Sequence, residues 1–266
     1  MTGRDALRAA VRAHLDAGGL LLGEAVGTHG LAAGIEGAGV RRTTLSENAT
    51  VGEAVGAALT GARVVVELLD PNGYARAGDA LADLSSLAPR SRGAWSAAVV
   101  VLAPWTPHAR VVPGLDLHVL GSADDAGSVL ERAFGGGRPA VVLVHDEGLD
   151  AEVCAQAPAA SGARVVRTGS RADGVVVLAV GPGVAAALAA ADARDAPVID
   201  LRTLAPLDRA TLGEHVRAAG RVVVVELADL LVPVVEEGFL TLENPPALTR
   251  ADAGEIAAAI DAVRAT

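Results

Sequence analysis

Short, continuous runs of apolar residues alternate along the chain with stretches rich in Ala and Leu. A continuous apolar run of this length is typical of a strand in a parallel sheet that helices cover on both faces. The predicted strands are Leu20–Leu22, Arg63–Leu68, Ala97–Leu102, His118–Leu120, Ala140–His145, Gly174–Val180, Pro197–Leu201 and Arg221–Glu226. Helices are expected between them, for example over Val184–Ala193 and Asp208–Ala219. The alternation of strand and helix indicates an α/β fold.

This alternation breaks once, at a segment rich in Ala, Pro and Ser. Between Asp150 and Gly162 no apolar pattern is sustained. A chain of 266 residues is long enough for two domains of ordinary size. We therefore predict two parallel-sheet α/β domains, at residues 1–150 and 169–266, joined by a linker at residues 151–168.

The composition excludes several classes of function. The chain has 22 basic and 32 acidic residues, so its net charge is −10, and every basic residue is Arg. Without a basic cluster, this balance argues against nucleic acid or an anionic membrane as the main partner. The single cysteine, Cys154, excludes an intramolecular disulfide and a multi-cysteine zinc site. The six histidines show no metal-binding pair, so no metal site is predicted on this chain.

No secretion signal or membrane span is expected. Residues Met1–Gly18 carry apolar side chains on one face and charges on the other, which is typical of an amphipathic surface helix. The longest uncharged run, Val175–Ala191, contains a Gly-Pro-Gly turn and is short for a membrane span. We expect a soluble, cytoplasmic protein.

One candidate site is the polar segment that starts at Thr43 and leads into a helix with two glycines on one face. Thr50 and Glu53 have the spacing of a capping box, which predicts that the helix begins there and gives Glu53 a structural role. Glu47 would then lie outside the helix with no capping role. It is therefore a candidate functional carboxylate, with an ordinary solvated loop residue as the alternative.

A second candidate is the G-x-G-x-x-A turn at Gly181–Ala186, which follows a predicted strand. Asp200 lies at the end of the next strand. This layout is typical of a dinucleotide-binding unit, in which helix amides bind the pyrophosphate and the acid binds the ribose. A tight turn without a ligand is the alternative. A serine nucleophile elbow is absent, and a chain without lysine has no P-loop.

Several segments spread over the chain follow, in order, the motifs of one known family. They are Gly23–Gly27, Thr44–Gly56, Pro104–Trp105, Pro113–Leu115, Val198–Asp208 and Phe239–Glu243. Glu67, Ala77 and Asp79 also fall where that family has an acid and an A-x-D motif. The sequence VIDLRTLAPLD at Val198–Asp208 is nearly identical to the family's V-I-D-L-R-T-x-x-P-x-D. The chain resembles the β subunit of thiamine diphosphate-dependent 2-oxoacid dehydrogenases, a relative of the C-terminal half of transketolase.

The resemblance implies a fold and a chemistry. It implies a transketolase-like pyrimidine-binding domain followed by a transketolase C-terminal-like domain. The expected function is that of a β-like subunit that helps cleave or form a C–C bond next to a carbonyl, by 2-oxoacid decarboxylation or ketol transfer. In the family, the carboxylate matching Glu47 hydrogen-bonds a ring nitrogen of the cofactor's aminopyrimidine and favours its imino tautomer. Glu24 resembles a second acid near the cofactor.

The chain also departs from the family pattern. The family stacks an aromatic ring at the position that aligns with Gly73, so the adjacent Tyr74 is the candidate for that contact. After Trp105 the family has a longer loop, which carries a histidine for acyl transfer to a lipoyl arm. His108 is the candidate replacement. The chain is also shorter than its relatives after Arg250. From these departures together we expect a shortened member that does not hand its product to a lipoyl carrier.

A partner chain is implied as well. The G-D-G…N motif that holds magnesium and the diphosphate in the family is absent here. We expect it on an α-like subunit, in a heterotetramer of two α and two β chains that binds thiamine diphosphate and Mg²⁺ between subunits and acts on a small ketone or 2-oxoacid. Two alternatives remain: a non-catalytic scaffold or regulatory subunit, and an NAD-dependent oxidoreductase built on the Gly181–Ala186 turn.

Overall fold

The computed structural model of the chain describes residues 2–123, 126–135, 138–150, 162–169 and 174–265. The chain divides into two compact units, Met1–Ala159 and Ala160–Thr266, which are described separately. Most of the range predicted as a linker, and Cys154 within it, lies outside the described residues. The end of that range is a strand, β7 (Arg164–Arg167). Two valines between arginines form too short an apolar run to predict a strand.

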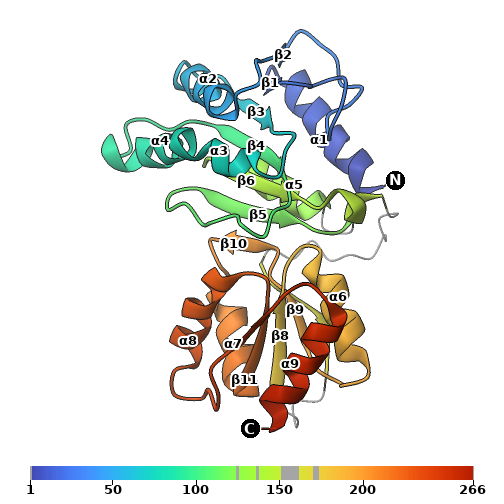
Figure 1. The fold of residues 1–266 in the computed structure, drawn as a ribbon. Helices are drawn as coiled ribbons and strands as arrows, with labels where there is room; N and C mark the ends of the chain where they lie inside the picture. The colour runs from blue at the N-terminus through green and yellow to red at the C-terminus, as the bar shows by residue number, and fades with distance from the viewer. Residues whose placement is uncertain (1, 124–125, 136–137, 151–161, 170–173, 266) are drawn as a thin grey trace. The chain divides into compact units, whose positions relative to one another are not determined.

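The first unit is built on a parallel sheet (Figure 1). Its elements are α1 (Gly3–Asp16), β1 (Leu20–Gly23), β2 (Val40–Arg42), α2 (Glu47–Leu59), β3 (Val64–Glu67), α3 (Gly73–Arg76), α4 (Gly78–Arg90), β4 (Val99–Pro104), β5 (Asp116–Leu120), α5 (Ala126–Gly135), β6 (Ala140–Val144) and the 3-10 turn η2 (Asp146–Leu149). The strands of this unit pair in the order β5-β6-β4-β3-β1-β2, all in parallel.

Helices cover both faces of this sheet. On one face, Leu7 and Val11 of α1 and Val129 of α5 pack in one core cluster with Leu21 and Val65 of the sheet. Helices α2 and α4 pack together on the opposite face (Figure 1). Every residue of β3 is buried, as burial on both faces of a central strand requires.

The second unit repeats this layering around a mixed sheet. Its elements are β7, β8 (Val175–Ala179), α6 (Gly183–Asp192), β9 (Val198–Asp200), β10 (Thr203–Ala205), α7 (Arg209–Ala219), β11 (Arg221–Val225), the 3-10 turn η4 (Ala228–Leu230), α8 (Leu231–Gly238), β12 (Ala247–Thr249) and α9 (Ala253–Ala265). The sheet order is β12-β11-β8-β9-β7, with β7 antiparallel to β9. Helices α6 and α9 pack on one face, and α7 and α8 lie on the other (Figure 1).

The predicted α/β class with two sheets is confirmed, and each strand predicted from an apolar run is present. Two of the strands that were not predicted, β2 and β12, have three residues each and only half-buried or exposed side chains. Both lie at the edge of a sheet. Because an edge strand buries little apolar surface, its sequence carries no continuous apolar run.

The predicted start of the second helix is wrong. Helix α2 begins at Glu47, and the Oγ of Ser46 caps it by accepting a hydrogen bond from the Ala49 amide at 3.4 Å. Thr50 is buried inside the helix, and its hydroxyl lies 2.8 Å from the Thr43 hydroxyl. Ser46 is followed at the third position by Ala49 rather than by an acid, so the more complete Thr50–Glu53 pattern dominated the prediction.

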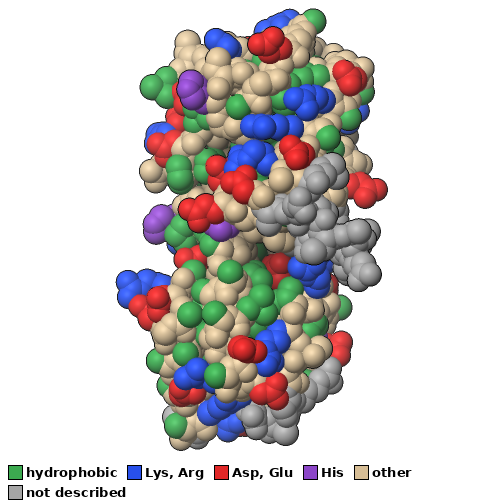
Figure 2. Space-filling view, turned by 90° about the vertical axis from the view of Figure 1, so that its right-hand side faces the viewer, with side chains coloured by type: hydrophobic (Ala, Val, Ile, Leu, Met, Phe, Trp, Pro, Cys, Tyr) green, Lys and Arg blue, Asp and Glu red, His purple; other side chains and the backbone are tan. Residues whose placement is uncertain are grey.

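Charged side chains are mixed on the surface. On the face that Figure 2 shows, arginines and acidic residues lie beside one another in both units. Many of them are paired, for example Arg194 with Asp261 at 2.6 Å. Among the described residues, no helix is both long enough and apolar enough to cross a membrane.

Candidate functional site

The candidate residues of the first unit follow neighbouring parallel strands. Glu24 comes directly after β1, Glu47 follows β2, Glu67 ends β3 and His108 follows β4. These four strands are adjacent in the sheet, in the order β4-β3-β1-β2. Because the carboxyl ends of parallel strands share one edge, the fold brings these segments to the edge where α/β proteins bind ligands.

Glu47 occupies the first position of α2. Its side chain is 12% exposed, and a carboxylate at this end of a helix is stabilised by the helix dipole. Its Oε1 accepts a hydrogen bond from the Nε of Arg76 at 2.9 Å and a second from a terminal nitrogen of the same guanidinium. The hydrogen bonds from Arg76 lower the pKa of Glu47 below its ordinary value, so Glu47 is charged near neutral pH.

Arg76 was not a candidate in the sequence. It is the last residue of the short helix α3 and lies 29 positions from Glu47. Its guanidinium also lies 3.3 Å from Oδ2 of Asp70, which follows β3. No local motif joins these three residues, since they meet only when α3 packs against α2.

Gly73 lies directly beside Glu47. A Cβ at this position would stand 3.3 Å from Cγ of Glu47 and 3.4 Å from Cβ of Leu68, a tight approach. A side chain at position 73 would therefore require Glu47 or Leu68 to shift slightly.

Tyr74 points away from solvent. It is 6% exposed, and its hydroxyl donates a hydrogen bond to the carbonyl of Arg110 at 2.5 Å. Burial raises the pKa of Tyr74 to about 12. The ring thus holds the segment after β4 that carries His108, and it offers little open face in this arrangement. Its stacking on a cofactor stays a prediction.

The other two predicted site residues are less enclosed. Glu24 is half-buried, and His108 is exposed, with its amide donating to the Thr106 hydroxyl at 3.3 Å. Among the described residues, neither side chain pairs with Glu47. The structure brings their segments to the same edge of the sheet, and their roles stay predictions.

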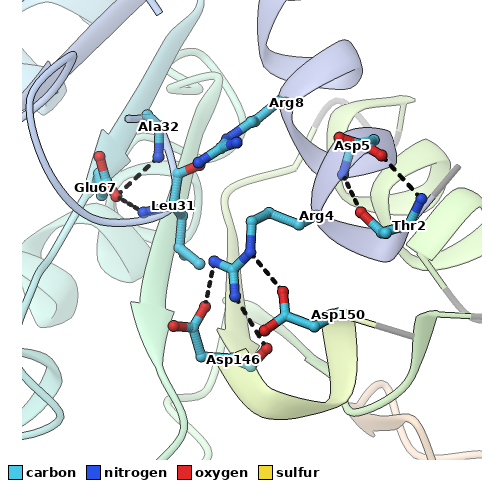
Figure 3. A network of polar contacts seen from close by, with 9 residues as sticks. All are labelled: Thr2, Arg4, Asp5, Arg8, Leu31, Ala32, Glu67, Asp146 and Asp150. Carbon is cyan, nitrogen blue, oxygen red and sulfur yellow. Dashed lines mark hydrogen bonds and ion pairs between the residues drawn. The ribbon is translucent and has the colours of Figure 1, made fainter. Parts of the chain in front are cut away.

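Glu67 is the buried acid of this edge. It is 2% exposed, and its Oε1 accepts hydrogen bonds from the amides of Leu31 at 2.5 Å and Ala32 at 3.1 Å (Figure 3). Its Oε2 has no hydrogen-bond partner among the described residues. Burial raises the pKa of Glu67. Arg8 donates a hydrogen bond to the Leu31 carbonyl at 3.2 Å. Arg8 and Glu67 therefore both hold the loop between β1 and β2.

A second polar contact in Figure 3 ties α1 to the segment after β6. Arg4 donates to Oδ1 of Asp146 and Oδ1 of Asp150, both at 2.8 Å. The carboxylates are more than half exposed, so we interpret this cluster as a structural tie on the surface.

In the second unit, the glycine turn has packing roles. Gly181 has a φ of +57°, which favours glycine. A Cβ on Gly183 would stand 2.9 Å from Cγ1 of Val225, so this glycine lets α6 approach β11. Asp200 is buried, and its Oδ1 accepts a hydrogen bond from the amide of Arg202 at 3.2 Å. These contacts account for the pattern as a strand-to-helix turn and favour that alternative over a dinucleotide site.

Comparison with known proteins decides the family. The model of the transketolase C-terminal domain matches residues 163–230. The pyruvate dehydrogenase E1 component subunit beta of Leifsonia xyli is 30% identical, over 85% of this chain and 78% of the relative. The chain belongs to this β-subunit family. A further member, the acetoin:2,6-dichlorophenolindophenol oxidoreductase subunit beta of Cupriavidus necator, is 31% identical over 76% of this chain and 68% of its own length.

The fold of this β-subunit-like chain also matches a solved structure. A split-gene transketolase, described as an inactive β4 tetramer, superposes with a TM-score of 0.75 at 19% identity and covers 100% of this chain and 98% of its own. At that identity the match concerns the fold, and it agrees with the predicted pair of transketolase-like domains. The resemblance seen in the sequence is thereby confirmed.

The family uses thiamine diphosphate, and the residues of the first unit fit one part of it. A mostly covered carboxylate at the ligand-binding edge of the sheet suits a hydrogen bond to a ring nitrogen. Within the described parts of the chain, no cluster of three His, Cys, Asp or Glu residues could hold a metal ion. The fit therefore concerns the aminopyrimidine end of the cofactor.

Proposed function

We propose that this chain is the β subunit of a two-chain thiamine diphosphate enzyme and that Glu47 activates the cofactor's aminopyrimidine. The observation that carries the proposal is the place of Glu47. It is a charged side chain with 12% exposure, at the start of α2 and at the carboxyl edge of a parallel sheet. Membership in the family supports the same role.

The chemistry divides between cofactor and protein. Thiamine diphosphate, when bound, supplies a stabilised carbanion that side chains cannot form. Glu47 would hold the cofactor's aminopyrimidine by a hydrogen bond between its carboxyl oxygen and a ring nitrogen, in which the two groups would share a proton. Glu24 lies at the same edge, after β1, as a second acid. His108 is the candidate replacement for the family's loop histidine, which serves acyl transfer.

The partner and substrate classes follow from the relatives. Both relatives are named as β subunits, which supports an α-like partner that binds the diphosphate and Mg²⁺ in a heterotetramer. Their names refer to pyruvate and acetoin, so we propose a short ketone or 2-oxoacid as substrate. Cleavage of a 2-oxoacid and ketol transfer both remain open for this site.

A first test is to isolate the complex. The tagged full-length chain is purified gently from native extract, and its companions and its thiamine diphosphate content are measured by mass spectrometry. We expect a stoichiometric partner with a diphosphate-binding motif and bound cofactor. A chain that is recovered alone and without cofactor would favour the scaffold alternative.

The decisive variant is Glu47→Gln in the assembled complex. Because the amide cannot share a proton in the same way, we expect turnover to fall by about 10²- to 10⁴-fold while the subunits stay associated. The matched control is Glu53→Gln, an exposed glutamate of the same helix, which should leave turnover unchanged. Wild-type turnover in the Glu47→Gln variant would show that Glu47 is not a catalytic residue.

A further inference from the structure

Arg76 already pairs with the carboxylate that a ring nitrogen of the cofactor would contact. Two nitrogens of its guanidinium donate to the same atom, Oε1. Arg76 is 46% exposed, whereas Glu47 is 12% exposed. The arginine is therefore the more accessible member of the pair, and it covers part of the Glu47 carboxylate.

The contact opposes the proposed chemistry. A guanidinium stays charged at all working pH values. It stabilises the carboxylate of Glu47 and so weakens the hold of that group on a proton. A ring nitrogen that shares a proton gains positive charge, and a neighbouring cation of the same sign makes this less favourable.

Asp70 is a second ionic partner for Arg76. Its Oδ2 lies 3.3 Å from the same guanidinium. The orientation of the Asp70 carboxylate is fixed because its other oxygen, Oδ1, accepts a hydrogen bond from the backbone amide of Asn72 at 2.6 Å. Arg76 thus lies between two carboxylates and can leave Glu47 without losing an ionic partner.

Resting on the proposed role of Glu47, we propose that Arg76 is a latch. It pairs with both Glu47 and Asp70 when no aminopyrimidine is bound, and it keeps only Asp70 as its partner when the ring nitrogen takes its place at Glu47. Arg76 is then a positioning residue that keeps the carboxylate oriented and covered in the empty subunit. Asp70 is the group that retains the arginine and makes the exchange favourable.

The first part of the test needs no partner chain. The full-length protein is labelled with ¹³C at glutamate carboxyls, and Glu47, assigned by its loss in Glu47→Gln, is titrated by NMR. In Arg76→Met we expect its midpoint to rise toward the ordinary value of about 4.3. The matched control, Arg194→Met, removes an arginine–carboxylate pair of the second unit and should leave the midpoint unchanged.

The second part measures binding of thiamine diphosphate with Mg²⁺ to the complex with the partner subunit. Arg76→Met should bind about fivefold tighter, the ratio that one partly exposed ion pair accounts for. Asp70→Asn should bind about two- to fivefold more weakly, since Arg76 loses its second carboxylate.

An unchanged Glu47 midpoint in Arg76→Met, or binding that is equal or weaker, would overturn the latch. Failure of the proposed function is separate. It would appear as normal cofactor binding and turnover in Glu47→Gln, whatever the titration of the Arg76 variant shows.

Discussion

The pKa values of two glutamates at one edge of the sheet are shifted in opposite directions by their surroundings. Arg76 lowers the pKa of Glu47, whereas burial raises that of Glu67. The difference follows from what each carboxyl contacts: a guanidinium in one case, and two backbone amides and apolar side chains in the other. An acid whose charged form is favoured by an arginine and an acid whose charged form is disfavoured by burial thus lie within one unit.

Glu67→Gln tests the anchoring role through the pH dependence of stability. Because the folded pKa of Glu67 is raised, its contribution is fully present below the unfolded pKa and is lost as pH rises through the folded pKa. The neutral amide does not ionise. We therefore expect the melting temperature of the variant, relative to wild type, to increase from pH 4 to pH 8.

Thermal unfolding followed by circular dichroism measures this difference. The exposed Glu53→Gln variant should run parallel to wild type over the same range. A parallel curve for Glu67→Gln as well would mean that Glu67 does not titrate differently in the folded and unfolded states.

Among the elements, α3 has the largest influence on the site for its size. This four-residue helix carries Gly73, Tyr74 and Arg76. One residue approaches Glu47, one anchors the segment after β4 and one pairs with the Glu47 carboxylate. Because Tyr74 contacts Arg110 and Arg76 contacts Glu47, α3 connects α2 to the segment that carries His108.

Tyr74→Phe tests this connection. The variant keeps the buried ring and loses the hydrogen bond to the Arg110 carbonyl, which should cost about 1 kcal/mol of folding stability. The segment after β4 should also open more often. We expect trypsin to cleave the folded protein faster after Arg110, as measured by mass spectrometry of timed digests. Cleavage after Arg92, a second exposed arginine, should keep its rate.

For the whole molecule, buried ionisable groups are expected to make the folding stability depend on pH in the acid range. His118 in β5 is fully buried, and burial lowers its pKa to about 4. The neutral form is favoured in the folded state, so this contribution is present above the unfolded pKa of about 6.5 and is lost as pH falls toward 4. Glu67 has the opposite effect on folding stability over part of this pH range, because its contribution increases as pH falls.

Denaturant unfolding between pH 7 and pH 4 tests the effect of His118. We expect wild type to lose about 2–3 kcal/mol through this group. His118→Gln, which cannot take up a proton, should be less stable at pH 7 but should show a flatter profile. Equal slopes for the two proteins would show that other groups control acid unfolding. His215→Gln, at a half-buried position of the second unit, is the matched control.

Much of this fold could be predicted because a strand that is buried on both faces has a continuous run of apolar residues in the sequence. Strand β8 consists of apolar residues throughout, and β3 is apolar up to Glu67 at its end, whereas the edge strand β2 contains Arg41 and Arg42 and was missed. The start of α2 was misplaced because a capping pattern at Thr50 was more complete than the Ser46 cap that forms. A local sequence pattern indicates which residues could cap a helix, but the packing of the helix decides which of them does.

By itself, the sequence determined the fold class, the β-subunit family and the candidacy of Glu47, because these depend on apolar runs and on ordered local motifs. Only the tertiary structure decided what Glu47 contacts. Its pairing with Arg76, the burial of Glu67 against the loop after β1 and the turn of Tyr74 toward Arg110 join residues 29 to 36 positions apart. Hydrogen bonds between distant residues have no period in the sequence, since they depend on how helices and loops pack at the edge of the sheet.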